Sequence, residues 1–335
     1  MRITNKSAYS KFLGQIEQIQ NNKLKEETRL ITGKKIVGIE DEPERLAEVK
    51  LLSSKISRNN GYHLNLEQSL AEMRTVMDNI EAMSDKVKEI RQLSIDAIQP
   101  GAVHTLSTYS SQIKGLLNDI INIANSDFNG KTLFSGTATT PLSLKIAPDD
   151  AVYSSNNLPF ELIVVNPPTA ENPSGMKVIF KGNNQDRIIN KDANSPEIIN
   201  VKSKEIFGEN LELFNDIIGI YNRLMYNSDG TIRNDNDFIT EQDSELIENF
   251  QKTLFDKDSQ ITGATSLFGA KYNRLDSLSR QIQNENVRLN EIKSYKSDTD
   301  VAKTTIALKM EETALMYSLQ VGSRIMQNSL FDFLK

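Results

Sequence analysis

The apolar positions between residues 49 and 87 recur in alternating steps of three and four. Nine of the twelve positions in this series, which runs from Val49 to Val87, are apolar. A seven-residue repeat of this kind predicts a left-handed coiled-coil seam. No proline lies between Pro43 and Pro100, so either one helix or two abutting helices can fill the interval, and Gly61 is where a bend would come. The predicted bundle seam in this segment consists of Leu52, Ile56, Leu66, Leu70, Met73, Met77 and Ile80.

A second seam with the same spacing lies near the other end of the chain. Shorter amphipathic stretches occupy residues 106–124, 211–225 and 246–255. Helices from both halves of the sequence therefore need apolar partners and can supply them to each other, which predicts an antiparallel bundle. The seam positions of this second segment are Leu275, Leu278, Ile282 and Leu289.

Residues 141–203 have a different character. Seven of the nine prolines fall here, together with two short β-forming runs at 160–165 and 176–180. The turn residues Gly182, Asn183 and Asn184 follow the second run. This segment predicts a small β-rich insertion.

The two ends of the chain are predicted to be helical. Residues 7–31 are compatible with a helix that stops at Gly33, and residues 297–300 offer N-caps for a helix over 301–328. The apolar residues of this last helix extend beyond one stripe, which indicates burial by more than one neighbour, and at a chain end such neighbours are often other subunits. The expected assembly residues are Phe12, Leu13, Ile16, Ile19, Leu308, Leu315, Leu319, Ile325, Leu330, Phe331, Phe333 and Leu334.

These patterns predict a mainly α fold: an elongated antiparallel coiled-coil or helix bundle formed by the N- and C-terminal halves, with a small β-rich inserted domain. Residues 1–40 and 296–335 would be terminal helices that are disordered in the free monomer. Residues 41–140 and 204–295 would form the bundle core, and residues 141–203 the outer insertion. An apolar content of 38% without tryptophan agrees with a thin molecule that leaves surface for a partner to bury.

The amino-acid composition excludes several kinds of catalytic and metal site. The chain has no cysteine and two histidines, His63 and His104, which excludes disulfides, thiol catalysis, Cys-ligated metals and three-His metal sites. The net charge of −6 does not favour a polyanion as partner, although residues 1–35 hold eight basic and three acidic side chains. No apolar run approaches a membrane span, and no ordinary signal peptide is visible. We therefore expect no enzyme, no cofactor, no metal, no nucleic acid and no membrane insertion.

Three weaker motifs have plainer explanations. Gly130-Lys131-Thr132 resembles a phosphate loop, but Asn125 stands where its first glycine should be and no strand precedes it. His63 lies on the first seam, where a polar residue that fixes register is the simpler reading than a ligand or pH switch. The acidic pairs at 149–150, 256/258 and 298/300 fit solvated loops and helix caps, while carboxylate pairs for glycoside chemistry stay open at this point.

Short segments of the chain resemble motifs of one family, the flagellin superfamily. The resemblance extends over roughly residues 1–140 and 205–335, and the insertion between them contains no such motif. The segments are Arg29–Ile36 (RLITGKKI, against the family pattern RL-x-[ST]-G-x-[RK]-I), Asp41-Glu42-Pro43 at a DDP-like turn, Ile90–Ile95 against VRELAV, Phe128–Gly130 with Leu133–Gly136 against FNG…LF-G, and the ending Ser329–Lys335.

The resemblance implies an extracellular structural subunit of the bacterial flagellum, exported through the flagellar type III apparatus without a cleaved signal. The start Met1–Lys6 and the ending near Phe331–Leu334 look most like the superfamily's hook–filament junction subunits. That likeness implies a junction adaptor that assembles through its terminal helices, with the insertion facing solvent. Glu89 and Gln92 depart from flagellins that innate immune receptors recognise, which puts such recognition in doubt.

The resemblance also implies a set of partners. They are further copies of the chain in a ring-like oligomer, a neighbouring hook-associated protein on the hook side, flagellin or a second junction protein on the filament side, and an export chaperone on the C-terminal helix. Two alternatives remain at this stage. One is a flagellin that forms the filament itself, and the other is a cytoplasmic coiled-coil scaffold.

Overall fold

The computed structural model describes residues 2–36, 38, 42–102, 105–144, 158–165, 168–169, 172–190, 196–234 and 237–333. Side chains are described for these residues except 2–6, 8, 142 and 325–333. The chain divides into two units, one of residues 1–61 with 282–335 and the other of residues 62–281. This division cuts across the predicted helical core, since it falls at Gly61 and Ile282. The predicted mainly α class is confirmed: long antiparallel helices dominate, and the strands form small pairs.

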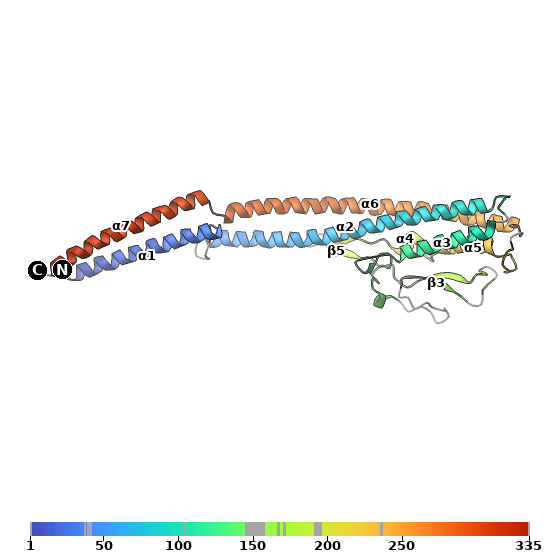
Figure 1. The fold of residues 1–335 in the computed structure, drawn as a ribbon, viewed down its shortest axis with the longest axis horizontal. Helices are drawn as coiled ribbons and strands as arrows, with labels where there is room; N and C mark the ends of the chain where they lie inside the picture. The colour runs from blue at the N-terminus through green and yellow to red at the C-terminus, as the bar shows by residue number, and fades with distance from the viewer. Residues whose placement is uncertain are drawn as a thin grey trace. The chain divides into compact units, whose positions relative to one another are not determined.

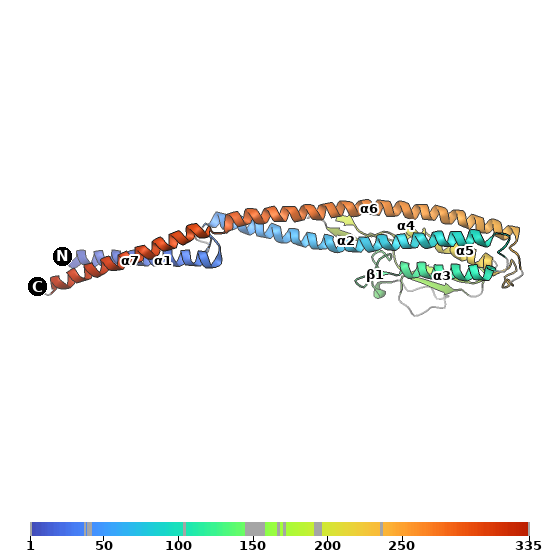
Figure 2. The same cartoon turned by 45° about the horizontal axis from the view of Figure 1, so that its top comes forward.

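The first unit is built from two whole helices and the ends of two others. Helix α1 (Arg2–Thr32) and helix α7 (Val301–Phe333) run antiparallel and pack side by side, as both ribbon views show (Figures 1 and 2). Gly33, at φ 67°, ends α1 in the left-handed conformation that favours glycine, which confirms the predicted C′ glycine. The Asp300 carboxylate accepts a hydrogen bond of 3.1 Å from the Lys303 amide, so Asp300 caps α7.

Two helices carry the predicted seams. Helix α2 (Pro43–Ala97) continues through Gly61 without a break, and helix α6 (Glu241–Ser297) joins the stretch 246–255 to the second seam. Two separate segments were expected in place of α6. The reason for the single helix is a strict heptad whose members are all buried: Ile247, Leu254, Ile261, Phe268, Leu275, Ile282 and Leu289.

The second unit also contains the shorter helices. These are α3 (Leu106–Ala124), α4 (Ser203–Phe207) and α5 (Glu212–Met225), of which α3 has the predicted bounds. A short 3-10 turn, η2, spans Pro141–Ser143. The strands form three antiparallel pairs: β1 (Asp127–Phe128) with β2 (Lys131–Thr132), β3 (Phe160–Val164) with β4 (Met176–Phe180), and β5 (Ile188–Asn190) with β6 (Pro196–Ile198).

The β3–β4 pair does not stand apart from the helices. The ring of Phe160 on β3 lies 4.9 Å from that of Phe207 on α4 and 6.0 Å from that of Phe214 on α5, centroid to centroid. All three rings are fully buried, and Figure 1 shows β3 beside the helices α3 and α5. One face of this hairpin therefore belongs to the core of the unit, because its aromatic residues have apolar helix faces to cover, whereas the insertion was expected to face solvent.

Candidate assembly surface

The α1–α7 pair has a well-defined inner side. Gly322 on α7 faces Phe12 on α1 so closely that a Cβ atom at Gly322 would lie 2.7 Å from Cε1 of Phe12. The Asn22 amide donates a long hydrogen bond of 3.4 Å to the Glu311 carboxylate across the pair. A glycine opposite a ring lets two helices approach closely, so this position sets how the terminal helices pair.

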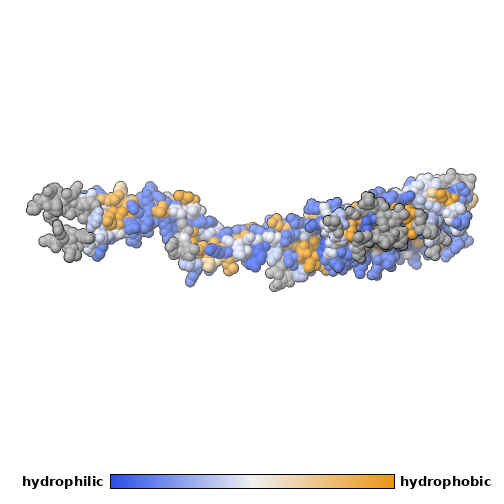
Figure 3. Space-filling model, turned by 90° about the horizontal axis from the view of Figure 1, so that it is seen from below, coloured by the Kyte–Doolittle hydropathy of each residue, from blue (hydrophilic) through white to orange (hydrophobic). Residues whose placement is uncertain are grey.

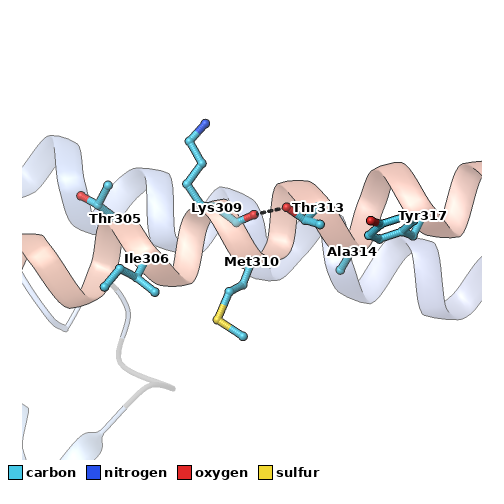
Figure 4. Close-up of a pocket in the computed structure, with 7 residues that line it drawn as sticks. All are labelled: Thr305, Ile306, Lys309, Met310, Thr313, Ala314 and Tyr317. Carbon is cyan, nitrogen blue, oxygen red and sulfur yellow. Dashed lines mark hydrogen bonds between the residues drawn. The ribbon is translucent and has the colours of Figure 1, made fainter.

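The outer side of α7 is apolar as well. Ile306, Met310, Ala314, Tyr317 and Val321 follow one another in steps of three and four and so form one stripe, which we call the outer stripe. Met310 is 68% exposed and Tyr317 is 61% exposed. Part of the outer stripe borders a groove of about 530 Å³, and the close-up shows Ile306 and Met310 pointing away from Lys309 (Figure 4).

Helix α1 has a comparable exposed face. Tyr9, Leu13, Leu24 and Ile31 are separated by 4, 11 and 7 residues, which places them on one side of the helix. Ile31 is 85% exposed. The space-filling view shows hydrophobic surface on the terminal helices among polar surface (Figure 3). Contiguous exposed apolar surface of this kind marks an interaction site.

The structure places the predicted assembly residues in three groups. Phe12, Ile16, Ile19, Leu308 and Leu315 are half-buried, and Leu13 and Leu319 are exposed. The other five have no described side chain: Ile325, Leu330, Phe331, Phe333 and Leu334.

Sequence reasoning did not assign the outer stripe to the assembly residues. The signal was present in the spacing from Ile306 to Val321. The helix has further exposed apolar residues, Val301, Met316 and Leu319, on another side, and these obscured the phase of the stripe.

The predicted bundle seam residues are all buried or half-buried. Three of them, Leu52, Met77 and Leu278, are half-buried. The others are buried: Ile56, Leu66, Leu70, Met73, Ile80, Leu275, Ile282 and Leu289.

His63 forms a polar layer in this seam. Its Nδ1 atom lies 2.9 Å from the Ser279 hydroxyl on α6, and that hydroxyl donates a 2.7 Å hydrogen bond to Glu67. In a nucleophilic triad the carboxylate orients the histidine, whereas here it accepts from the serine. Ser279 is also buried, so this layer lacks the order and the access that hydrolysis needs.

The remaining motifs also lack site geometry. Asn129 and Gly130 both have positive φ in the β1–β2 turn, and the Gly130 amide donates to the Asp127 carboxylate at 2.9 Å instead of pointing at a free anion. Among the described residues no group of His, Asp and Glu could hold a metal ion. The described part of the chain contains no helix long and apolar enough to cross a membrane. His104 and the pair Asp149-Asp150 lie outside the described residues.

Comparison with known proteins identifies the N-terminal part of the chain. Residues 3–139 match the bacterial flagellin N-terminal helical region. The resemblance to the flagellin superfamily is confirmed for this part of the chain. A curated relative, flagellar hook-associated protein 3 of Escherichia coli (strain K12), is 26% identical over 151 residues. That match covers 43% of this chain and 46% of the relative, so the chain spans less than half the length of the curated relative it matches.

Solved structures share the fold. A putative flagellar hook-associated protein from Vibrio parahaemolyticus superposes with a TM-score of 0.59 at 15% identity, covering 77% of this chain and 99% of that one. The flagellar hook associated protein-3 from Legionella pneumophila gives a TM-score of 0.52 at 11% identity, covering 74% and 97%. At these identities the likeness establishes the fold. The fold shared with these two structures therefore extends well beyond residues 3–139.

Proposed function

We propose that the chain is a structural subunit of the bacterial flagellum, a junction adaptor between hook and filament that assembles through α1 and α7. The observation that carries this proposal is the outer stripe on a paired terminal helix, in a chain whose N-terminal part matches the flagellin helical region. The hook-associated name of the curated relative supports the junction role over that of a filament subunit.

The mechanism is burial of apolar surface between subunits. Each fully buried Met, Leu, Ile or Val side chain stabilises a contact by about 1.5–3 kcal/mol. The four large residues of the outer stripe, Ile306, Met310, Tyr317 and Val321, stay more than half exposed while α7 packs on α1, so a neighbouring subunit can cover them without displacing α1. Because a different side of α7 packs on α1, each subunit can bind a neighbour while its own helix pair stays intact.

The partners follow from the same surfaces. Copies of the chain would contact one another through the terminal helices in a ring-like oligomer. A hook-associated protein would lie on the hook side and flagellin or a second junction protein on the filament side. Before assembly an export chaperone would cover the exposed apolar side of α7, since such a surface is prone to self-association in water. The protein would reach the flagellum by type III export and act outside the cell, without catalysis.

The test is a charge placed in the outer stripe. Met310→Asp should leave the isolated chain folded, because Met310 is exposed there, but it would bury a carboxylate in the subunit contact. We expect cells that carry only Met310→Asp to lose swimming in soft agar and to lack the protein in isolated flagella.

Gln320→Asp is the matched control. Gln320 is exposed on the same helix, on the polar side that carries Lys309 and Thr313, so this variant should swim normally. Normal swimming by Met310→Asp, with the variant present at the usual level in isolated flagella, would refute assembly through the outer stripe.

A further inference from the structure

The two linkers that lead to the terminal helices are joined to each other. Lys34, just after α1, and Asp298, just before α7, form an isolated antiparallel β-bridge. The Lys35 amide donates to the Ser297 carbonyl at 2.7 Å, and the Thr299 amide donates to the Gly33 carbonyl at 2.9 Å. These hydrogen bonds connect segments that are far apart in the sequence: Lys34 and Asp298 are separated by 264 residues.

Side chains reinforce this pairing around one carboxylate. Asp298 accepts hydrogen bonds from the Lys34 ammonium group, from the Ser294 hydroxyl at 2.5 Å and from the Ser297 hydroxyl at 2.8 Å. Lys34 thus lies opposite Asp298 in the backbone bridge, whose two hydrogen bonds come from the neighbouring residues, and pairs with Asp298 directly through its side chain. A simple connection between helices needs none of these contacts.

We propose that these paired linkers, residues 33–35 with 297–299, are a clasp that makes α1 and α7 dock as one body. With the clasp closed, the end of α1 and the beginning of α7 are fixed to each other, so neither helix can swing away while the other stays in place. The step from clasp to assembly rests on the proposed function, whereas the clasp itself is a property of the folded chain.

The order of folding follows from the separation of the two linkers. Closing a loop of this length in an unfolded chain is entropically unfavourable, and a few hydrogen bonds with a net value of about 0.5–1.5 kcal/mol each do not compensate for ordering the residues involved. The α2–α6 contact, through Lys55–Glu285 and Asn60–Asn286, brings the linkers close beforehand. The clasp would then close late, after the whole chain up to Thr299 is available, so that a truncated chain does not present paired terminal helices.

The absence of native cysteine allows a direct test. Residues opposite each other in an antiparallel bridge have Cα atoms about 4.5–5.5 Å apart, within the roughly 4.4–6.8 Å that a disulfide spans. The double variant K34C/D298C should therefore form an intramolecular disulfide in most molecules of the purified full-length chain under mild oxidation. The matched control I36C/D298C is out of register by two residues, at about 7–8 Å, and should remain largely reduced.

A charge exchange tests whether the clasp couples the helices. Lys34→Asp faces Asp298 with a like charge and should speed amide hydrogen exchange in both α1 and α7 by about tenfold. The exchange rates in α3 and α5 should not change. The double variant K34D/D298K restores opposite charges and should return both terminal helices to slow exchange.

Three outcomes would overturn the clasp. They are equal oxidation of K34C/D298C and its control, an effect of Lys34→Asp on α1 without α7, and no recovery in the charge-exchanged variant. The role of the clasp in assembly is tested separately, by looking for the K34C/D298C disulfide in flagella isolated from cells that produce this variant. The disulfide should form after export, since the cytosol keeps thiols reduced. If K34C/D298C cross-links as purified protein, but neither this variant nor the wild-type chain is found in isolated flagella, the proposed function is contradicted and the clasp is not.

Discussion

At the scale of the residue, glycines decide where α1 ends and how closely the terminal helices pair. Gly33 ends α1 because it adopts a positive φ at no steric cost, and the sequence pattern predicts this end correctly. Gly322 has a different role, since its missing side chain leaves room for the ring of Phe12. That role could not be predicted, because the two residues are 310 positions apart and nothing in the local sequence around Gly322 points to Phe12.

Gly322→Ala tests this close approach. An added Cβ would overlap the Phe12 ring, and overpacking of this kind costs about 1–3 kcal/mol, which exceeds the gain of up to about 1 kcal/mol from alanine's higher helix propensity. We expect faster hydrogen exchange of amides in both α1 and α7.

Gly14→Ala is its control. Gly14 lies on α1, and a Cβ atom added there would meet no neighbouring atom within 4 Å, so the propensity gain should act alone and slow the exchange in α1. Slower amide exchange in both variants would contradict the claim that the close Gly322–Phe12 contact determines how α1 and α7 pack.

The Asp298 carboxylate predicts a pH dependence for the linker pairing. Hydrogen bonds from Lys34, Ser294 and Ser297, together with the Lys34 charge, lower its pKa from 3.8 to about 2. A lowered pKa stabilises the folded form above the unfolded value, and this contribution disappears as the pH falls through the folded value. The Asp298 carboxyl should therefore titrate near pH 2 by NMR, and Lys34→Met should move its pKa back toward 3.8. A wild-type pKa close to the ordinary aspartate value would contradict the ion pair.

At the scale of the element, the periodicity of hydrophobic residues predicts where helices occur better than it predicts how long they are. The bounds of α3 and the α2 seam follow from apolar spacing alone. Helix α6 was expected as separate stretches, because its middle has only one large apolar seam residue in every two turns. These residues are Ile261 and Phe268, and most of their neighbours are polar. A single position every seven residues suffices once the partner helix supplies the other half of the contact.

A buried ion pair between Arg233 and Asp243 links the segment between α5 and α6 to the start of α6. Arg233 contacts the Asp243 carboxylate at 2.5 Å and donates to the Phe238 carbonyl at 2.7 Å, and Asp243 also accepts from Thr240 at 2.8 Å. Arg233 and Asp243 are both buried. A buried charge without its partner is strongly unfavourable, so the pair should be sensitive to removal of either member.

Arg233→Ala should lower the free energy of unfolding by about 3 kcal/mol, because it leaves the buried Asp243 with only the more distant Arg223 as a cationic partner, at 3.6 Å. Guanidinium unfolding followed by circular dichroism measures the loss. The control, Arg280→Ala, removes an exposed arginine that pairs with Asp276 one turn away on α6, and such pairs contribute about 0–1 kcal/mol. Equal losses in the two variants would show that burial does not strengthen the Arg233–Asp243 pair.

At the scale of the whole molecule, sequence and structure supply different parts of the account. The mainly α class and the superfamily resemblance follow from seams and motifs at both ends of the chain. The β3–β4 hairpin, the outer stripe of α7 and the paired linkers depend on contacts between segments far apart in the sequence, such as Phe160 with Phe207. A single sequence shows which residues are apolar and so favour burial, whereas the folded chain shows which of them are buried and which stay exposed.

The central claim, a junction adaptor, is tested most directly in cells that lack this protein. Electron microscopy of the cell surface, with an assay of flagellin in the spent medium, separates the roles. We predict hooks without filaments and flagellin monomer released into the medium, because filament subunits would be exported with nothing to bind to. Hooks without filaments and without released flagellin would mean that this chain is itself the filament subunit, and filaments of normal length would contradict any role at the junction.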